Sequence, residues 1–501
     1  MTQPAPKQFD PIETTVDEIH EAMRERHVTA ETLVEVYRSR IGEYDDELNA
    51  ILTLNDDARA RARRLDSRFE SEGFVGPLHG VPVVLKDNHD TRDIPTTAGS
   101  VTLAESRPPR DAFVVEQLRD AGAVVVAKAN LQELSFGVDT ISSLGGATRN
   151  AYDLDRRPSG SSGGTAAAIA ANLGAIGTGS DTCSSVRSPP AFNALVGVRP
   201  TRGLVSRRGI VPLSETQDTA GPIARTVTDA ARTLEVMAGY DPEDPVTARG
   251  VGRIPAEGYA SGLDGAGLDG ARIGIARQFF GARTGQDDDE DERVTAVIED
   301  AIETMAGGGA TIVDPVEVVD LDRLESARVV SHEFARDFAR YLSEAGAAVP
   351  YDSLAEVVAT GEIAPAVESR IEASGALDVD AASLNEDAEY LSRLRRRRDL
   401  RDETLSRLAA EDLDALLYPP STVPPVEIPA HQPFEEMNCE LAAHTGLPAV
   451  VVPAGFTDDG LPVGVELLGR AFAERRLFEV AYAFEQTIDG RRPPERFGKI
   501  E

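Results

Sequence analysis

Lysine is nearly absent from this chain, so the few lysines that remain are informative. Of the 51 basic residues among 501, only Lys7, Lys86, Lys128 and Lys499 are lysine, which leaves 47 arginines. Lys86 ends an apolar, strand-like run over residues 80–85. Arginine stays charged at any working pH, whereas a buried lysine can lose its proton and act as a base. The run therefore predicts either a solvated strand end or a catalytic base at Lys86.

Two serine motifs follow in a region rich in glycine and serine. The first spans residues 160–164 and includes Ser161; the second spans residues 181–187 and includes Ser185. Small residues allow backbone N–H groups to approach a substrate oxygen, which an oxyanion hole requires. A serine is a weak nucleophile without an adjacent base. The seven histidines are scattered, and none lies in an evident serine-hydrolase context, which favours lysine as the base.

Residues 160–164 have three competing interpretations. They match the G-x-S-x-G elbow with Ser162 as nucleophile, but that elbow needs a preceding strand, and residues 152–158 form a poor one. A phosphate-binding loop needs lysine after its last glycine, where this chain has Thr165. The third interpretation is a structural turn, and this short pattern alone leaves the choice open.

The charge of the chain excludes several classes of partner. With 85 acidic residues and a net charge of −34, the protein repels nucleic-acid phosphates and anionic membranes. The acids are spread along the chain, and lysine is depleted while arginine is kept. This pattern is typical of adaptation to multimolar salt, where the Debye length falls to about 3 Å, so we expect a halophilic source.

The same sequence predicts a soluble cytoplasmic protein without a metal or other cofactor. Its two cysteines, Cys183 and Cys439, do not make a disulfide framework. Residues 1–7 lack the apolar core of a signal peptide. We find no run of about 18 apolar residues and no Cys/His cluster at metal-ligand spacing.

Strands alternate with helices along the chain, which predicts a largely parallel sheet with both faces covered. The arginine run over residues 395–398 is expected on an exposed helix face, paired with nearby acids. The expected strands are residues 81–85, 123–127, 310–313, 415–418 and 449–452. The expected helices lie within residues 10–70 and at 112–121, 165–173, 294–305 and 474–487.

Several motifs in one order are more specific than any single pattern. On these motifs the chain resembles the amidase signature family of serine hydrolases, over most of residues 10–490. The motifs are residues 76–88, 160–167, 179–189, 195–201, 445–450 and 460–470. The resemblance implies an α/β amidase signature fold, a large mixed, mostly parallel sheet with helices on both faces.

Carried over by motif position, the resemblance implies a Ser-Ser-Lys triad. Ser185 is then the nucleophile, Lys86 the base, and Ser161 the bridging serine, which the family holds in a cis peptide linkage. The backbone N–H groups of Thr182, Cys183, Ser184 and Ser185 would hold the oxyanion. The residues expected to support this loop are Ser162, Asp181 and Arg187.

This chain departs from many relatives, which carry glycines just before the nucleophile, because it has Cys183 and Ser184. The bulkier residues are expected to narrow the pocket, and Cys183 is expected to fill space rather than to have a redox role. The substrate pocket is expected to draw on the loop over residues 136–143 and on the region over residues 330–440. Its candidate residues are Phe136, Gly137 and Asn438, and Glu333 and Phe334 are further candidates. A structural role is the alternative for Asn438, Glu333 and Phe334.

The sequence thus predicts an amidase that cleaves the carbon–nitrogen bond of a small carboxamide or peptide amide. One alternative is the glutaminase (A) subunit of a tRNA-dependent amidotransferase, and the other is a non-catalytic amidase-like binding protein. Residues 216–218 (Thr-Gln-Asp) argue against the amidotransferase subunit, because such subunits usually have Leu-Asp-Gln at that place. A homodimer would be ordinary but does not follow from the sequence.

We expect a single domain over residues 1–501. It would comprise N-terminal helices (10–70), a catalytic core (76–240), a variable substrate region (241–430) and a C-terminal core (431–490).

Overall fold

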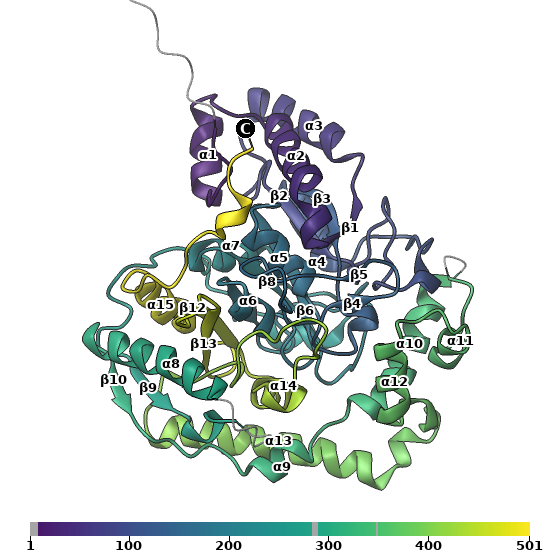
Figure 1. Ribbon diagram of the computed structural model, residues 1–501, viewed down its shortest axis with the longest axis vertical. Coiled ribbons are helices and arrows are strands. Elements are labelled where there is room, and N and C mark those ends of the chain that lie inside the picture. The colour runs from purple at the N-terminus through teal and green to yellow at the C-terminus, as the bar shows by residue number, and fades with distance from the viewer. Residues whose placement is uncertain (1–8, 283–288, 347–348, 501) are drawn as a thin grey trace, which may run out of the picture.

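A mixed sheet of eleven strands runs through the part of the chain that the structure describes. In this computed structural model that part is residues 9–282, 289–346 and 349–500 (Figure 1). The strands of the first half are β1 (Ile51–Leu54), β2 (Pro82–Lys86), β3 (Val124–Ala129), β6 (Ile176–Asp181), β7 (Val196–Arg199) and β8 (Thr219–Ala224). Those of the second half are β9 (Arg272–Ile275), β10 (Thr311–Val313), β11 (Ala415–Tyr418), β12 (Ala449–Phe456) and β13 (Pro462–Leu468). A separate hairpin pairs β4 (Ile141–Ser142) with β5 (Gly146–Ala147).

The strand order across the sheet is β1-β3-β2-β6-β8-β7-β12-β13-β11-β9-β10. Parallel pairing forms two blocks, β3-β2-β6 and β11-β9-β10. The remaining pairs are antiparallel. The strands β8, β7, β12 and β13 join the two blocks through antiparallel pairs, and β1 pairs antiparallel with β3 at one edge of the sheet. Antiparallel pairs are thus more numerous than the alternation of strands and helices led us to expect, while the α/β class and mixed sheet are confirmed.

Helices cover the sheet on both faces. The first are α1 (Val16–Arg24), α2 (Ala30–Leu48), α3 (Ala58–Glu72), α4 (Phe113–Asp120), α5 (Gly163–Ala170), α6 (Ser188–Phe192) and α7 (Val227–Met237). The later ones are α8 (Glu290–Gly307), α9 (Leu321–Glu325), α10 (Val330–Ala345), α11 (Leu354–Ala359), α12 (Pro365–Ser374), α13 (Ala388–Ala410), α14 (Glu440–Thr445) and α15 (Glu474–Glu485). Near the middle of the sheet, α5 and α6 contact each other, while α7 contacts α4 and α15. None of the helices in the described residues combines the length and apolar character needed to cross a bilayer.

The parallel block β3-β2-β6 explains where chemistry can occur. The carboxyl ends of parallel strands meet at one edge of a sheet, and ligands bind in the crevice outside them. Lys86 is the last residue of β2, and Asp181 is the last residue of the neighbouring β6. The loop that follows β6 therefore begins beside Lys86.

A second apolar cluster closes over this edge. It joins side chains of α10, α11 and α12 to the loop around Leu134 and Phe136. The rings of Phe136 and Phe334 stack with their centroids 5.2 Å apart. In Figure 1 α10, α11 and α12 lie together at one side of the molecule. The helices α10, α11 and α12 of the variable region thus supply a cover, whereas β9, β10 and β11 of the same region belong to the sheet.

The C-terminal tail docks on the N-terminal helices through one buried arginine. Arg40 of α2 donates to the carbonyl oxygens of Phe497 and Gly498, and also to those of Ala171 and Asn172. Its side chain is buried. Residues 497 and 498 are therefore held to α2 and, through the same arginine, lie near the residues that follow α5.

The prediction that the arginines of residues 395–398 lie on an exposed helix face is wrong at one position. Arg395 and Arg398 are exposed, but Arg397 is buried within α13. It donates to the carbonyl oxygen of Ala443 and to the side chain of Gln217. Burial lowers the pKa of Arg397 to about 9. Helical spacing places only one member of a four-residue run squarely on the buried side.

Candidate active site

Lys86 is fully buried and its amine lies among hydroxyl groups. Its Nζ lies 2.6 Å from Ser161 Oγ and 2.9 Å from Ser180 Oγ. Within the described residues it forms no ion pair, whereas Lys128, the other buried lysine, pairs with Asp87 at 2.8 Å. Desolvation lowers the pKa of Lys86 to about 7, against a smaller opposing effect of Asp181 and Asp218. A large neutral fraction at neutral pH follows, as a base requires.

Ser161 connects this lysine to Ser185. The Gly160–Ser161 peptide is cis, as the resemblance implies. The N–H of Ser161 donates to Ser185 Oγ at 3.0 Å. Proton transfer from Ser185 requires its hydroxyl to come within hydrogen-bond distance of Ser161 Oγ, and such contacts often tighten only when substrate binds. The structure thus places all three predicted triad side chains at one point.

The turn after β6 presents a row of free backbone donors. Among the hydrogen bonds of the described residues, none uses the N–H groups of residues 182–185 as donors. The carbonyl side of the same turn is occupied, because Ser184 O accepts from the N–H groups of Arg187 and Ser188. The free N–H groups lie beside the hydroxyl of Ser185, where an oxyanion would form. This arrangement can stabilise a tetrahedral intermediate.

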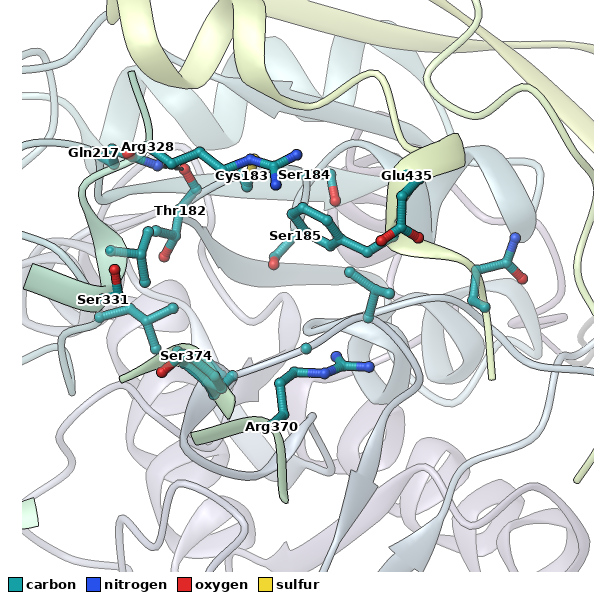
Figure 2. A pocket seen from close by; sticks show the side chains of 18 of the residues that line it. Thr182, Cys183, Ser184, Ser185, Gln217, Arg328, Ser331, Arg370, Ser374 and Glu435 are labelled. Atoms are coloured by element: carbon teal, nitrogen blue, oxygen red, sulfur yellow. Dashed lines mark hydrogen bonds between the residues drawn. The ribbon is translucent and has the colours of Figure 1, made fainter. Parts of the chain in front are cut away.

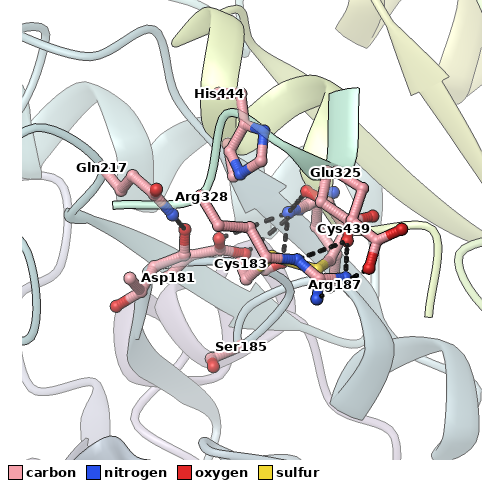
Figure 3. Close-up of a disulfide and its surroundings, with 12 residues drawn as sticks. Asp181, Cys183, Ser185, Arg187, Gln217, Glu325, Arg328, Cys439 and His444 are labelled. Atoms are coloured by element: carbon pink, nitrogen blue, oxygen red, sulfur yellow. Dashed lines mark hydrogen bonds and ion pairs between the residues drawn. A yellow bond between two sulfur atoms is a disulfide. The ribbon is translucent and has the colours of Figure 1, made fainter. Parts of the chain in front are cut away.

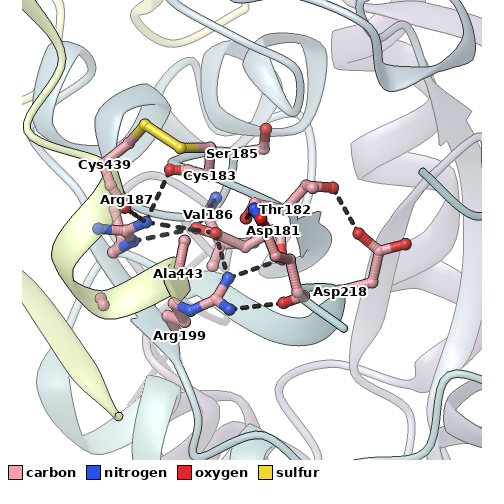
Figure 4. Close-up of polar contacts among 12 residues, drawn as sticks. Asp181, Thr182, Cys183, Ser185, Val186, Arg187, Arg199, Asp218, Cys439 and Ala443 are labelled. Atoms are coloured by element: carbon pink, nitrogen blue, oxygen red, sulfur yellow. Dashed lines mark hydrogen bonds and ion pairs between the residues drawn. A yellow bond between two sulfur atoms is a disulfide. The ribbon is translucent and has the colours of Figure 1, made fainter. Parts of the chain in front are cut away.

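A buried ionic network supports the turn (Figure 4). Asp181 pairs with Arg187 at 3.1 Å and also with Arg199, and Arg187 pairs with Glu466 of β13 at 2.8 Å. All four side chains are fully buried. Burial alone would raise the pKa of Asp181, but the two arginines hold it at about 2. Ser162 lies just before α5, with its hydroxyl 3.4 Å from Ser180 O.

A second chain of contacts reaches the turn from the opposite direction. Thr182 Oγ1 donates to Asp218 at 2.6 Å, and Gln217 Nε2 donates to Thr182 O at 2.9 Å. Gln217 is held in turn by the buried Arg397 of α13. The supporting role of Arg397 was not predicted from the sequence. The signal that could have indicated it is helical spacing, which places Arg397 on the same buried side of α13 as Leu400 and Leu408.

The expectation for the cysteines is wrong. Cys183 and Cys439 form a disulfide, with their Cα atoms 4.9 Å apart (Figure 3). Cysteine count cannot exclude a single bridge, because residues 256 positions apart become neighbours only in the folded chain. Cys183 therefore does more than fill space: it ties the turn to the start of α14.

A cavity of about 640 Å³ opens in front of Ser185 (Figure 2). Phe136 and Gly137 line it, as predicted. Asn438 does not line it, because its side-chain amide turns away to the carbonyl oxygens of Phe279 and Pro419. Most of the lining side chains are apolar or small. The charged and imidazole groups that line it are Arg328, Arg370, His431, Glu435 and His444.

Arg370 of α12 is the cation that faces this cavity from the side opposite the turn (Figure 2). Its nearest carboxylate is Asp139, at 3.8 Å, and Asp139 is already bound by His431 at 2.8 Å. Arg370 Nη1 is buried without a hydrogen-bond partner among the described residues. It lies over Gly137, where any side chain would collide with it. Within the described part of the chain, Arg370 thus has an unsatisfied donor nitrogen beside the cavity.

Within the described residues no group of three or more His, Cys, Asp or Glu side chains could hold a metal ion. A buried amine of lowered pKa, two serines and a row of free N–H groups can together carry out acyl transfer.

Comparison with known proteins points to one family. The profile of the family described as Amidase matches residues 32–478. The X-ray structure of native peptide amidase from Stenotrophomonas maltophilia is 35% identical, with a TM-score of 0.85 over 97% of this chain and 99% of that chain. The structure of the A subunit of glutamyl-tRNA(Gln) amidotransferase from Thermotoga maritima is 29% identical, with a TM-score of 0.74 over 97% of each chain. The same subunit from Pseudomonas aeruginosa is 36% identical over 489 residues, 95% of this chain and 97% of the relative.

Proposed function

The chain belongs to the Amidase family and is an amide-hydrolysing enzyme, and from that premise we propose that Lys86, Ser161 and Ser185 form its catalytic triad. Its substrate is a small carboxamide or a peptide amide, which it converts to a carboxylate and ammonia or an amine. No cofactor takes part in this scheme.

The proposed reaction begins with neutral Lys86. It accepts the proton of Ser161 while Ser161 accepts that of Ser185, and Ser185 Oγ attacks the amide carbonyl. The N–H groups of residues 182–185 hold the oxyanion. Ser161 then returns a proton to the leaving nitrogen, and an acyl-enzyme remains. Water, activated through the same two groups, hydrolyses the ester and restores Ser185.

One observation carries the proposal. The amine of Lys86 lies 2.6 Å from Ser161 Oγ, is fully buried, and forms no ion pair within the described residues. A lysine needed only for charge would be paired, as Lys128 is with Asp87. Desolvation without a close counter-charge favours the neutral amine.

The cavity supports a substrate with an apolar part and a polar end. Apolar side chains that line it include Phe136, Leu213, Val330 and Phe434. A volume of about 640 Å³ lies in the range of small-molecule sites. Arg370 supplies a donor for a carbonyl or carboxylate oxygen of the acyl part.

A second candidate function is the glutaminase role within a tRNA-dependent amidotransferase. It is favoured by relatives of that name at 36% identity, as high as the identity to the peptide amidase. The higher TM-score of the peptide amidase, 0.85 against 0.74, favours the stand-alone enzyme. The stand-alone role is therefore the one we propose, in a salt-rich cytoplasm, which the net charge of −34 supports.

The test is ammonia release from a panel of amides in multimolar KCl. The panel holds acetamide, benzamide, indole-acetamide, a C-terminal peptide amide and glutamine. Ser185→Ala is compared with wild type and with Ser71→Ala, a control at an exposed site on α3. We expect release by wild type and by the control, and none by Ser185→Ala.

Each other outcome has a defined meaning. Turnover that survives in Ser185→Ala contradicts the nucleophile assignment. Glutamine turnover that appears only with partner proteins supports the amidotransferase role. A folded wild type that turns over none of these amides contradicts the proposed substrate class.

A further inference from the structure

The disulfide links the nucleophile turn to the segment that leads into α14. Cys183 lies in the turn whose N–H groups are free, directly beside Ser184 and Ser185, and it lines the cavity. Cys439 immediately precedes α14. Residues 433–435, a few positions before Cys439, also line the cavity. The disulfide is thus a covalent link between two segments that both contribute to the cavity.

The same two segments are also joined by one arginine. Arg187 Nη2 donates to Cys183 O at 2.7 Å and to Cys439 O at 3.1 Å (Figure 3). Arg187 is itself held by Asp181 and Glu466. Its guanidinium joins the two carbonyl groups by hydrogen bonds, and the disulfide adds a covalent link between the same two segments.

The two cysteines differ in their burial. Cys183 is only partly buried and borders the cavity, whereas Cys439 is fully buried against Ala191, Phe192 and Met437. The cavity is therefore the side from which a small thiol would approach the disulfide, at Cys183.

We propose that the Cys183–Cys439 disulfide is a redox-controlled positioning element of the oxyanion-binding turn. The oxidised protein holds the N–H groups of residues 182–185 in the orientation that hydrolysis needs. Reduction frees the turn from α14 and lowers kcat while substrate binding is retained. The inference rests on the proposed function of Ser185 and of these N–H groups.

The chemical step is a thiol–disulfide exchange with a dithiol. A thiolate of the dithiol attacks Cys183 Sγ, the Cys183–Cys439 bond breaks, and Cys439 leaves as a thiolate that takes up a proton. The second thiol of the reductant then attacks the mixed disulfide and releases Cys183. Two electrons and two protons pass to the cysteine pair, and the dithiol becomes a cyclic disulfide. Disulfides in a reducing cytosol are mostly transient, catalytic or redox-sensing, which agrees with this role.

The experiment measures kcat and KM for the best amide before and after treatment with dithiothreitol. Alkylation and mass spectrometry of the intact protein count the free thiols. We expect two thiols per reduced chain and kcat lower by about tenfold to a hundredfold, the range set by misplaced oxyanion donors, with KM within about threefold. Reoxidation should restore kcat.

A second readout isolates the oxyanion donors. An aldehyde analogue of the substrate forms a tetrahedral adduct with Ser185 and so uses the same N–H groups. Its inhibition constant should rise on reduction by the same factor by which kcat falls. An amine product, which forms no adduct, should bind equally to both forms. A disulfide that only stabilised the fold would change neither ratio.

The variant Cys439→Ala keeps the Cys183 backbone and removes the link. It should show the kcat of the reduced form and no response to dithiothreitol. The inference is overturned if reduced wild type has two free thiols but an unchanged kcat, or if Cys439→Ala has an unchanged kcat. The redox control is overturned if saturating dithiothreitol does not reduce the disulfide of wild type. Loss of the variant to misfolding leaves the reduced wild type as the deciding measurement. Turnover that depends on Ser185 but not on the disulfide defeats only this inference, whereas an oxidised wild type without turnover defeats the proposed function.

Discussion

Replacing Lys86 with methionine should abolish activity and, at neutral pH, make the protein more stable. The side chain is fully buried, and desolvation lowers its pKa from 10.5 to about 7. A group with a lowered folded-state pKa binds fewer protons in the folded than in the unfolded protein across that interval. The unfolding free energy contributed by Lys86 therefore rises with pH between 7 and 10.5 and is lowest below pH 7.

The magnitude follows from the two pKa values. Each pKa unit corresponds to about 1.4 kcal/mol, so wild type at pH 7 lacks about 5 kcal/mol of unfolding free energy that it has above pH 10.5. Methionine removes this cost but leaves the hydroxyls of Ser161 and Ser180 without the amine, which costs roughly 2 kcal/mol. We expect Lys86→Met to be more stable by about 3 kcal/mol at pH 7, with the advantage shrinking by about 1.4 kcal/mol for each pH unit.

The assay is urea unfolding in fixed KCl at several pH values between 7 and 9.5, together with ammonia release. Other titrating groups cancel in the difference between wild type and variant. Lys499→Met removes one positive charge at an exposed site and serves as the control. It should keep full activity, and its difference from wild type gives the effect of removing one exposed positive charge.

Two results would refute the reasoning. A stability difference between wild type and Lys86→Met that is independent of pH would show that Lys86 is not forced towards neutrality in the folded protein. Amide turnover by Lys86→Met within about tenfold of wild type would remove Lys86 from the mechanism, because general-base catalysis contributes at least about a hundredfold.

Three further predictions test other parts of the site. In wild type, kcat/KM should fall about tenfold per pH unit below the Lys86 pKa of about 7 and level off above it; a profile flat down to pH 5 contradicts a lysine base. Arg370→Leu should raise KM at least about tenfold for amides with a carbonyl or carboxylate in the acyl part, with kcat little changed, because a charge-assisted hydrogen bond is lost; equal KM values for wild type and variant would exclude that contact. Asp181→Asn should lower the unfolding free energy by about 3–5 kcal/mol, because it leaves two buried arginines short of a partner. The folded-state pKa of Asp181 is about 2, below the ordinary 3.8, so the stability that Asp181 contributes to wild type is present above pH 4 and is lost only as the pH falls towards 2. A destabilisation by Asp181→Asn that vanishes already at pH 5 would contradict this.

Local patterns predicted five of the eleven strands of the main sheet (β2, β3, β10, β11 and β12) and missed the other six, including β6. The apolar run before Lys86 forms β2, and the run over residues 415–418 forms β11 with the expected bounds. The parallel neighbours β2 and β6 carry Lys86 and the turn before Ser185 to one edge. The resemblance to the amidase signature family is what predicted that the three side chains meet. The catalytic roles themselves stay predictions.

Long-range pairing could not be predicted from the same patterns. The antiparallel insertion of β8 and β7 depends on which strand edges remain free after the first block forms, and no local signal encodes that. The disulfide between Cys183 and Cys439, and the contact of Arg397 with Gln217, likewise join segments that are far apart in sequence. The scarcity of lysine also does not separate the two buried lysines. They differ in their partners, since Lys86 lies beside the Ser161 hydroxyl whereas Lys128 pairs with Asp87.

The docking of the C-terminal tail has a consequence for synthesis. Arg40 receives two of its carbonyl partners from residues 497 and 498, which follow it by more than 450 positions. At about 5–20 residues per second, a ribosome needs roughly 20–90 s to deliver them after Arg40 has emerged. During that time the guanidinium of Arg40 in the nascent N-terminal helices lacks two of its carbonyl acceptors. Protection of α2 from proteolysis should therefore appear only after residues 497 and 498 have emerged from the ribosome.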